Sequence, residues 1–333
     1  MDARLAALER WLAQQFAGAA HQIAPASEDA SFRRYFRARL ADGRSYVVMD
    51  APPDRENCAP FVRVAQLLRG AGLHAPEVHA QDLEQGFLLL SDLGTKTFLD
   101  VLDERNAGAL MRDATAALLR WQLATRPGVL PPYDDALLRR EMELFPDWYI
   151  GRHLGTTLSA TRQRELHEIF ALLAGSALAQ AQVYVHRDYM PRNLILSEPN
   201  PGVLDFQDAV TGPIAYDMVS LLRDAFLSWS EDRVLDWAVR YWEQAKQAAL
   251  PVDADFAEFW RAFEWMGLQR HLKVMGIFAR LTYRDGKPKY VADTPRFVGY
   301  ARAVATRYAP LEPLARLLDE LEVRAQQAGH PFR

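Results

Sequence analysis

Cysteine is almost missing from this chain of 333 residues. Cys58 stands alone, which excludes an intrachain disulfide and any zinc or iron–sulfur site built from several cysteines. The eight histidines include no H-E-x-x-H pair, so the helical zinc motif of metalloproteases is missing as well. A chain so poor in cysteine suits a reducing compartment, and we expect it to be cytoplasmic.

Long apolar runs and a charge excess are also lacking. The longest uncharged stretch rich in apolar residues, 169–185, has 17 residues and contains Ser176, Gln180 and Gln182, so it falls short of a bilayer span. The N-terminus carries Asp2 and Glu9 and lacks the basic start of a secretory signal. With 39 Lys and Arg against 43 Asp and Glu, the composition does not favour a strongly basic nucleic-acid binder. We expect no membrane, no nucleic acid and a monomer.

The sequence pattern differs between the first and the later part of the chain. Residues 34–40 and 45–49 flank an Asp42-Gly43 turn and predict a β-hairpin, and two further strands are predicted at 76–80 and 86–91. After Asp92 nearly every long segment has the apolar spacing of a helix. The sequence therefore predicts an α+β protein with a small sheet-rich lobe followed by a larger helical lobe, and the length fits two such lobes.

The most informative segment runs from residue 183 to 217. His186 and Asp188 follow a short apolar strand, Asn193 comes five residues after that aspartate, and Asp205 ends another apolar strand. Phosphoryl transfer needs such a set, because the protein must position the attacking hydroxyl, accept its proton and hold the cation that neutralises the phosphates. Oxygen ligands of this kind are those that Mg²⁺ prefers. We expect the oxygens of residues 188, 193 and 205 to converge on one divalent ion.

These residues resemble the kinase-like phosphotransferases, in which an H-x-D-x-x-x-x-N loop precedes a metal-binding D-F-G. Here Gln207 replaces the glycine, and the short distance from Asp205 to Pro213 leaves no room for a protein-kinase activation segment. The chain is therefore similar to small-molecule kinases such as the aminoglycoside and choline phosphotransferases. The resemblance implies a protein-kinase-like bilobal fold, with residues 1–93 as an N-lobe on the nucleotide-phosphate side and 94–333 as a helical C-lobe with the catalytic loop and acceptor site. It also implies ATP and Mg²⁺, with Asp188 catalytic and Asn193 and Asp205 as metal ligands.

His186 and Asp217 are predicted to support the catalytic loop. Asp217 precedes an apolar helix predicted at 218–226, so it is also interpreted as the N-cap of that helix. In the family that the chain resembles, the aspartate at this place supports the loop.

The usual strand lysine is missing, because Lys96 is the first lysine of the chain. Three explanations stay open: the phosphates are met by Arg33, Arg34 or Arg37, or by Mg²⁺ and loop amides, or by nothing, in a pseudokinase. The loop 27–34 occupies the place of a glycine-rich loop and has no glycine. We favour phosphate contact and assign this role to four residues: Ser31, Phe32, Arg33 and Arg34.

Two further regions are assigned to ligands. Ser91, Asp92 and Leu93 are interpreted as a hinge that contacts adenine through backbone groups. An ordinary strand followed by a turn explains this sequence equally well. Aromatic and carboxylate groups suit a sugar and arginines suit a carboxylate. Candidate acceptor residues are therefore Glu141, Trp148, Tyr149, Arg270 and Arg280. The alternative is that these are core residues and solvated helix charges.

Over nearly the whole length the chain resembles one branch of that superfamily, the bacterial anomeric kinases of N-acetylmuramate and N-acetylglucosamine. The segments that carry this resemblance are 29–37, 47–53, 86–94, 186–193, 203–209 and 269–281. It implies transfer of the ATP γ-phosphoryl group to the C1 hydroxyl of an amino sugar, giving a sugar 1-phosphate for cell-wall recycling. A kinase of another hydroxyl acceptor, aminoglycoside or choline-like, and a catalytically weak ATP-binding regulator are the alternatives.

Overall fold

The computed structural model describes residues 3–27 and 32–327 and divides the chain into two compact units. Unit 1 comprises Met1–Trp121 and Arg192–Asp208, and unit 2 comprises Gln122–Pro191 and Ala209–Arg333. The bounds of the two units differ from those of the predicted lobes. Backbone groups that come later in the chain form hydrogen bonds with the N-terminal part of unit 1. The amide of Val203 donates to the carbonyl of His74 at 2.7 Å, and the amide of Leu196 donates to that of Lys96 at 2.8 Å.

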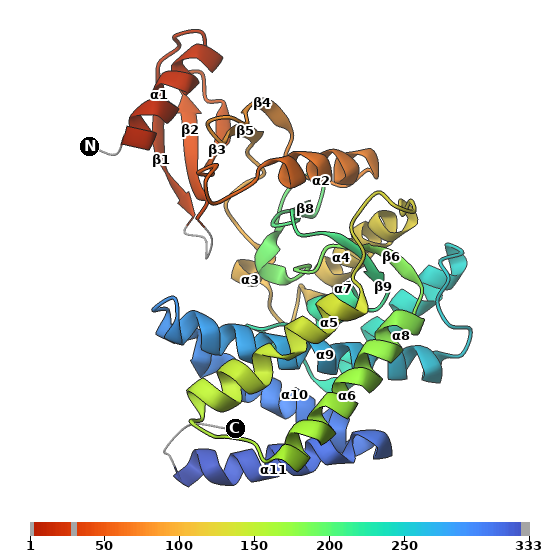
Figure 1. Cartoon of the computed structure of the whole chain (residues 1–333). Coiled ribbons are helices and arrows are strands. Elements are labelled where there is room, and N and C mark those ends of the chain that lie inside the picture. Colours follow the sequence, from red (N-terminus) through yellow and green to blue (C-terminus); the bar gives the residue numbers. More distant parts are fainter. Residues whose placement is uncertain (1–2, 28–31, 328–333) are drawn as a thin grey trace. The chain divides into compact units, whose positions relative to one another are not determined.

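Unit 1 is built on a five-stranded antiparallel sheet in the order β1-β2-β3-β5-β4 (Figure 1). The strands are β1 (His21–Ser27), β2 (Arg34–Leu40), β3 (Ser45–Asp50), β4 (Val78–Asp82) and β5 (Phe87–Ser91). The predicted hairpin is confirmed, with Arg34 opposite Asp50 and Arg39 opposite Ser45. Strand β1 was not predicted, and it extends the sheet beyond β2 as an edge strand.

Helices and a second hairpin complete unit 1. Helix α1 (Ala3–Gln15) buries Leu8, Trp11 and Leu12 in one cluster with the sheet residues Val48 and Phe87. This is the amphipathic packing that covers one face of a sheet. The other elements are α2 (Ala59–Gly70), which begins after the buried Cys58, α3 (Phe98–Val101), most of α4 (Ala107–Leu123), β7 (Leu194–Ile195) and β8 (Gly202–Val203).

Unit 2 is mainly helical around one short antiparallel pair, β6 (Gln182–Val185) and β9 (Val210–Pro213). Its helices are α5 (Asp135–Met142), η1 (Phe145–His153), α6 (Ala160–Ala179), α7 (Tyr216–Leu222), α8 (Glu231–Gln247), α9 (Phe256–Tyr283), η3 (Pro288–Asp293), α10 (Thr294–Arg307), η4 (Ala309–Leu311) and α11 (Glu312–Gln327). The short η2 (Pro191–Asn193) spans the boundary between the units. Helix α9 is central, since it packs against α5, α6, α7, α10 and η1. The α+β class is confirmed.

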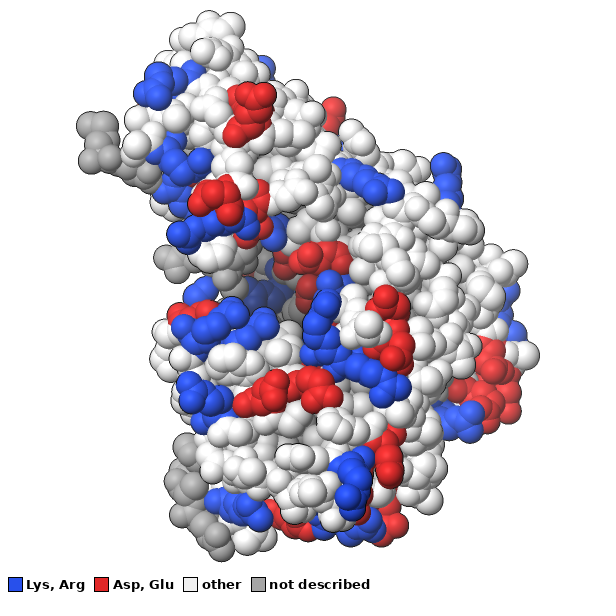
Figure 2. Space-filling model, viewed as in Figure 1, with Lys and Arg blue, Asp and Glu red and all other residues white. Residues whose placement is uncertain are grey.

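The charges on the surface and the apolar content of the helices agree with what the sequence indicates. On the face shown in Figure 2, Lys and Arg lie among Asp and Glu, in line with the near balance of the two signs in the sequence. None of the helices formed by the described residues combines the length and the apolar character needed to cross a bilayer.

Candidate active site

A cavity of about 280 Å³ within unit 1 gathers three separate stretches of the chain. Strands β2 and β3 contribute Arg37 and Val47 to its wall. The end of β5 and the following turn contribute residues 91–95, and the segment 192–205 contributes Asn193 and Asp205. The residues predicted for the hinge and for the metal therefore line the same cavity.

Asn193 and Asp205 are neighbours at the base of the β7–β8 hairpin. The side-chain amide of Asn193 lies 3.4 Å from Oδ2 of Asp205, and the amide of Leu204 donates to the carbonyl of Asn193 at 2.9 Å. Asp205 has a positive φ of 60°, so its backbone is held in a conformation that non-glycine residues seldom adopt. Such backbone strain often accompanies functional sites.

The residues after Asp205 fix its carboxylate. Nε2 of Gln207 donates to Oδ1 of Asp205 at 2.9 Å, and the buried ring of Phe206 packs on Phe61 with centroids 4.7 Å apart. The glutamine that stands where D-F-G has glycine thus adds a hydrogen bond to the acidic group. Among the described residues no group of three or more His, Cys, Asp or Glu could hold a metal ion alone. One carboxylate and one amide fit Mg²⁺, which usually keeps waters and binds phosphates as its other ligands.

The hinge residues use their side chains to build the turn. The carboxylate of Asp92 accepts hydrogen bonds from Nε of Arg37 at 2.7 Å, from Oγ of Ser45 at 2.6 Å and from the amide of Gly94 at 3.1 Å. Burial opposes the charged form, but these donors hold the pKa of Asp92 below its ordinary value. Oγ of Ser91 accepts from the amide of Glu77 at 2.9 Å.

Leu93, the third predicted hinge residue, is buried. With the side chains of all three residues engaged in the fold, their contribution to a ligand in the cavity would come from backbone groups.

The arginines predicted for phosphate contact differ in their partners. Arg34 pairs with the buried carboxylate of Asp50, which Arg4 also contacts. Nε of Arg33 lies 3.5 Å from Oε2 of Glu56, the longest of these ion pairs. Phe32 is exposed, and Ser31 lies outside the described residues.

The catalytic loop begins where β6 ends, in unit 2. His186 is buried, its ring Nδ1 accepts from the amide of Asp188 at 3.2 Å, and Arg187 has a φ of 77°. The carboxylate of Asp217 accepts from the amides of His186 at 2.7 Å and of Arg187 at 3.0 Å. These bonds fix the backbone that presents Asp188.

Asp217 is not the N-cap of its helix, so that interpretation was wrong. Helix α7 begins at Tyr216, and the N-cap position is Ala215, which makes no side-chain cap hydrogen bond. Asp217 therefore lies inside the first turn, fully buried, with its carboxylate turned to the catalytic loop. Burial raises its pKa to about 7, although the two amide donors and Arg270 oppose the shift.

Glu141 is the centre of a buried charge cluster rather than an open sugar acceptor. Its carboxylate accepts from the hydroxyl of Tyr133, from Nη2 of Arg187 and from Nζ of Lys273, the last at 2.9 Å. Lys273 also donates to the hydroxyl of Tyr216 at 3.0 Å. Three donors occupy the carboxylate, so the geometry does not support the predicted role of Glu141 in binding a sugar.

The other predicted acceptor residues are mostly inside unit 2. Tyr149 is fully buried, and Trp148 and Arg280 are half-buried. Arg270 is buried and interacts with the carboxylates of Asp217 and Asp224, so it is a counter-ion within the core instead of a solvated charge. Their role towards an acceptor stays a prediction.

The sequence reasoning missed Lys273 and Arg187. Residues 265–279 of α9 contain Arg270, His271 and Lys273 among otherwise uncharged residues. A helix that is apolar on all sides is buried, so a lysine inside such a run was a readable signal. For Arg187 the signal would have been its place between two motif residues.

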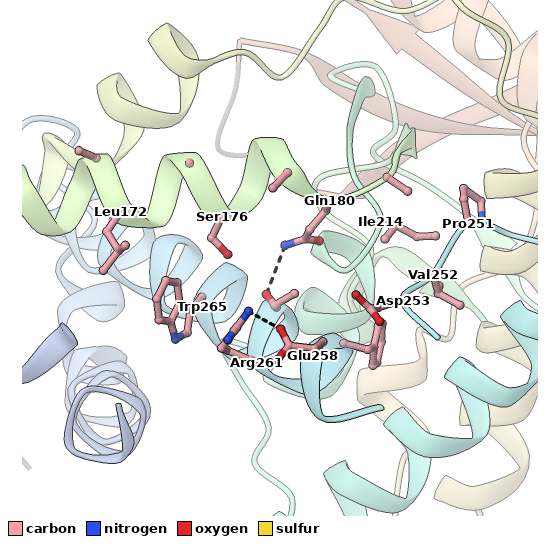
Figure 3. A pocket seen from close by; sticks show the side chains of 16 residues that line it. Leu172, Ser176, Gln180, Ile214, Pro251, Val252, Asp253, Glu258, Arg261 and Trp265 are labelled. Carbon is pink, nitrogen blue, oxygen red and sulfur yellow. Dashed lines mark hydrogen bonds and ion pairs between the residues drawn. The ribbon is translucent and has the colours of Figure 1, made fainter. Parts of the chain in front are cut away.

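A larger cavity of about 680 Å³ lies elsewhere in unit 2 and contains none of the motif residues (Figure 3). Ser176 of α6 and Gln180, directly after that helix, face the Arg261–Glu258 ion pair and Trp265 of α9 across it. The residues predicted for the chemistry lie instead along the smaller cavity and in the predicted catalytic loop.

Comparisons with known proteins agree with this arrangement. The chain is 52% identical over 98% of its length, and 98% of the relative's, to a protein of Pseudomonas putida named N-acetylmuramate/N-acetylglucosamine kinase. A relative of the same name from Pseudomonas aeruginosa is 56% identical, covering 92% of this chain and 90% of that one. Another from Neisseria meningitidis is 49% identical, covering 94% and 95%.

Solved structures confirm the bilobal kinase-like fold. An ADP-bound aminoglycoside phosphotransferase matches with a TM-score of 0.59 at 15% identity, covering 90% of this chain and 98% of that one. A choline/ethanolamine kinase family protein from Mesorhizobium loti matches with a TM-score of 0.63 at 13% identity, covering 94% and 99%. A sequence model described as the phosphotransferase enzyme family matches residues 22–260. The chain therefore belongs to the phosphotransferase enzyme family.

Proposed function

We propose that this phosphotransferase moves the γ-phosphoryl group of ATP to the anomeric C1 hydroxyl of N-acetylmuramate or N-acetylglucosamine. The observation that carries the proposal is the match, at 49–56% identity and over more than nine-tenths of the chain, to relatives named for these sugars. Transfer to C1 follows from the resemblance to the anomeric kinases, and it suits the chemistry because an anomeric hydroxyl is more acidic than an ordinary alcohol.

The proposed nucleotide site is the cavity of unit 1. Backbone groups of residues 91–94 would meet the base, because their side chains are used in the turn. Arg33, which pairs with Glu56, stays the proposed phosphate contact; Arg34 pairs with Asp50, and Arg37, which lines the cavity, pairs with Asp92. Asn193 and Asp205 would hold Mg²⁺, which neutralises phosphate charge when bound.

Asp188 is proposed as the base that orients the sugar hydroxyl and accepts its proton. Its direction is set by His186 and Arg187, whose backbone amides are bound by Asp217. That the carboxylate of Asp188 converges with Asn193 and Asp205 stays a prediction. The residues that select the sugar stay predictions too, with Trp148, Tyr149, Arg270 and Arg280 as candidates.

The test is ADP release in the presence of ATP and Mg²⁺ with a panel of acceptors. We expect N-acetylmuramate and N-acetylglucosamine to support turnover, and choline, ethanolamine and aminoglycosides to give background rates. Asp188→Asn should bind ATP like the native protein while turnover with the sugars falls by about 10³-fold. Turnover with an aminoglycoside alone, or undiminished turnover in Asp188→Asn, would contradict the proposal.

A further inference from the structure

Two cations and one carboxylate are buried together next to the catalytic loop. Glu141 comes from α5, Lys273 from α9, and Arg187 from the loop itself, and the exposed fractions of their side chains are 8%, 9% and 18%. The hydroxyls of Tyr133 and Tyr216 complete the cluster by bonding to Glu141 and Lys273. Taking ions out of water is costly, so a cluster of this kind persists only when its members are paired and hydrogen-bonded.

The cluster carries one positive charge more than its own carboxylate balances. Burial disfavours the charged form of Lys273, yet Glu141 above all, and Tyr216 and Asp188 besides, keep the pKa of Lys273 above its ordinary value. Asp188 acts on Arg187 in the same direction. The carboxylate of Asp188 therefore favours the charged form of both cations.

We propose that Lys273 is a positioning residue for the phosphoryl transfer. Through Glu141 it fixes the guanidinium of Arg187, the residue directly before Asp188. Arg187 is then held at both ends, by Glu141 at its side chain and by Asp217 at its backbone amide. This inference rests on the proposed role of Asp188 and assigns Lys273 no contact with the sugar or the nucleotide.

The test compares Lys273→Met and Glu141→Gln with Glu264→Gln. Glu264 is the matched control, because it is a buried carboxylate on the same helix α9, paired with Arg307 and hydrogen-bonded by Tyr308. All three variants lose part of a buried ion pair, and all three are expected to unfold at lower temperature. We expect kcat to fall by about 30-fold or more in Lys273→Met and Glu141→Gln, with KM for ATP within about twofold of native, while Glu264→Gln keeps its kcat.

Two results would overturn the inference: native kcat in folded Lys273→Met, or an equal loss of kcat in Glu264→Gln. If Lys273→Met does not fold, the double variant Glu141→Gln/Lys273→Met removes one charge of each sign and leaves Arg187 with Asp188. We expect this variant to fold and remain slow, and native kcat in it would again overturn the inference. Asp188→Asn separates the two proposals: if it stays active, the proposed base is wrong, whatever Lys273 does.

Discussion

Nζ of Lys273 lies 2.9 Å from Oε1 of Glu141, and this pair joins α9 to α5 inside unit 2. One turn further along α9, Gly276 meets the backbone of Leu144, three residues after Glu141. A Cβ on Gly276 would lie 2.3 Å from the carbonyl carbon of Leu144. Because Gly276 has no side chain, the two segments can approach closely, and this approach brings Lys273 within ion-pair distance of Glu141.

Gly276→Ala is the first prediction. The added methyl meets backbone atoms, which cannot rotate away, so α9 and the segment that joins α5 to η1 must separate. We expect the free energy of unfolding to fall by about 3 kcal/mol and kcat to fall with it. Urea unfolding and steady-state kinetics check both effects.

Gly299→Ala is the control for this change. Gly299 lies in α10, and a Cβ there would meet nothing within 4 Å. Alanine is the better helix former, so this variant should gain about 0.5–1 kcal/mol and keep its kcat. Equal stability of the two variants would refute the packing argument.

Arg33 is predicted to bind the phosphates in place of the missing strand lysine. Arg33→Ala should raise the Kd for ATP by about tenfold, equivalent to about 1.4 kcal/mol. Titration calorimetry with ATP and Mg²⁺ measures this directly. Arg44→Ala serves as the control, because Arg44 pairs with Asp42 at an exposed hairpin turn. If both variants bind ATP like the native protein, Arg33 is not the phosphate contact.

Much of the small sheet was predictable, and its first strand was not. Strands β2 and β3 have apolar residues around an Asp-Gly turn, which signals a hairpin at short range. Strand β1 has the sequence HQIAPAS, whose Pro25 argues against a central strand. The proline is tolerated because β1 is at the edge, beside β2 only. Edge position is a property of the sheet and cannot be read from the segment itself.

The candidate site was likewise predictable from the sequence only in part. The order and spacing of Asp188, Asn193 and Asp205 are visible in the sequence, because the motif is local. The partners of the catalytic loop are not: Glu141 and Lys273 are 46 and 86 residues from Arg187, and burial turns them from apparent surface charges into a paired cluster. Sequence spacing could not show that the carboxylate of Glu141 is already occupied.

Asp217 gives a prediction about pH. The pKa of Asp217 in the folded protein, about 7, lies above the ordinary value of about 3.9 for an aspartate, so the folded state binds the proton more tightly. Its contribution to stability is therefore fully present below about pH 4 and is lost as the pH rises to 7. Because asparagine does not titrate, the Asp217→Asn variant does not show this loss of stability as the pH rises. The unfolding free energy of the variant minus that of the native protein should rise by about 2 kcal/mol between pH 5 and pH 7.

Denaturant unfolding across this pH range provides the measurement. Asp217→Asn should also lower kcat, because an amide cannot accept from both backbone N–H groups that the carboxylate binds. A flat difference for Asp217→Asn would show that the carboxyl titrates normally.

The most direct measurement is the ³¹P spectrum of the product formed from N-acetylmuramate, ATP and Mg²⁺. We predict a sugar phosphate whose phosphorus is coupled to the anomeric proton, and no such product from Asp188→Asn. Phosphorus coupled to the C6 protons, or ADP formed with no phosphorylated sugar, would contradict the proposed transfer to C1.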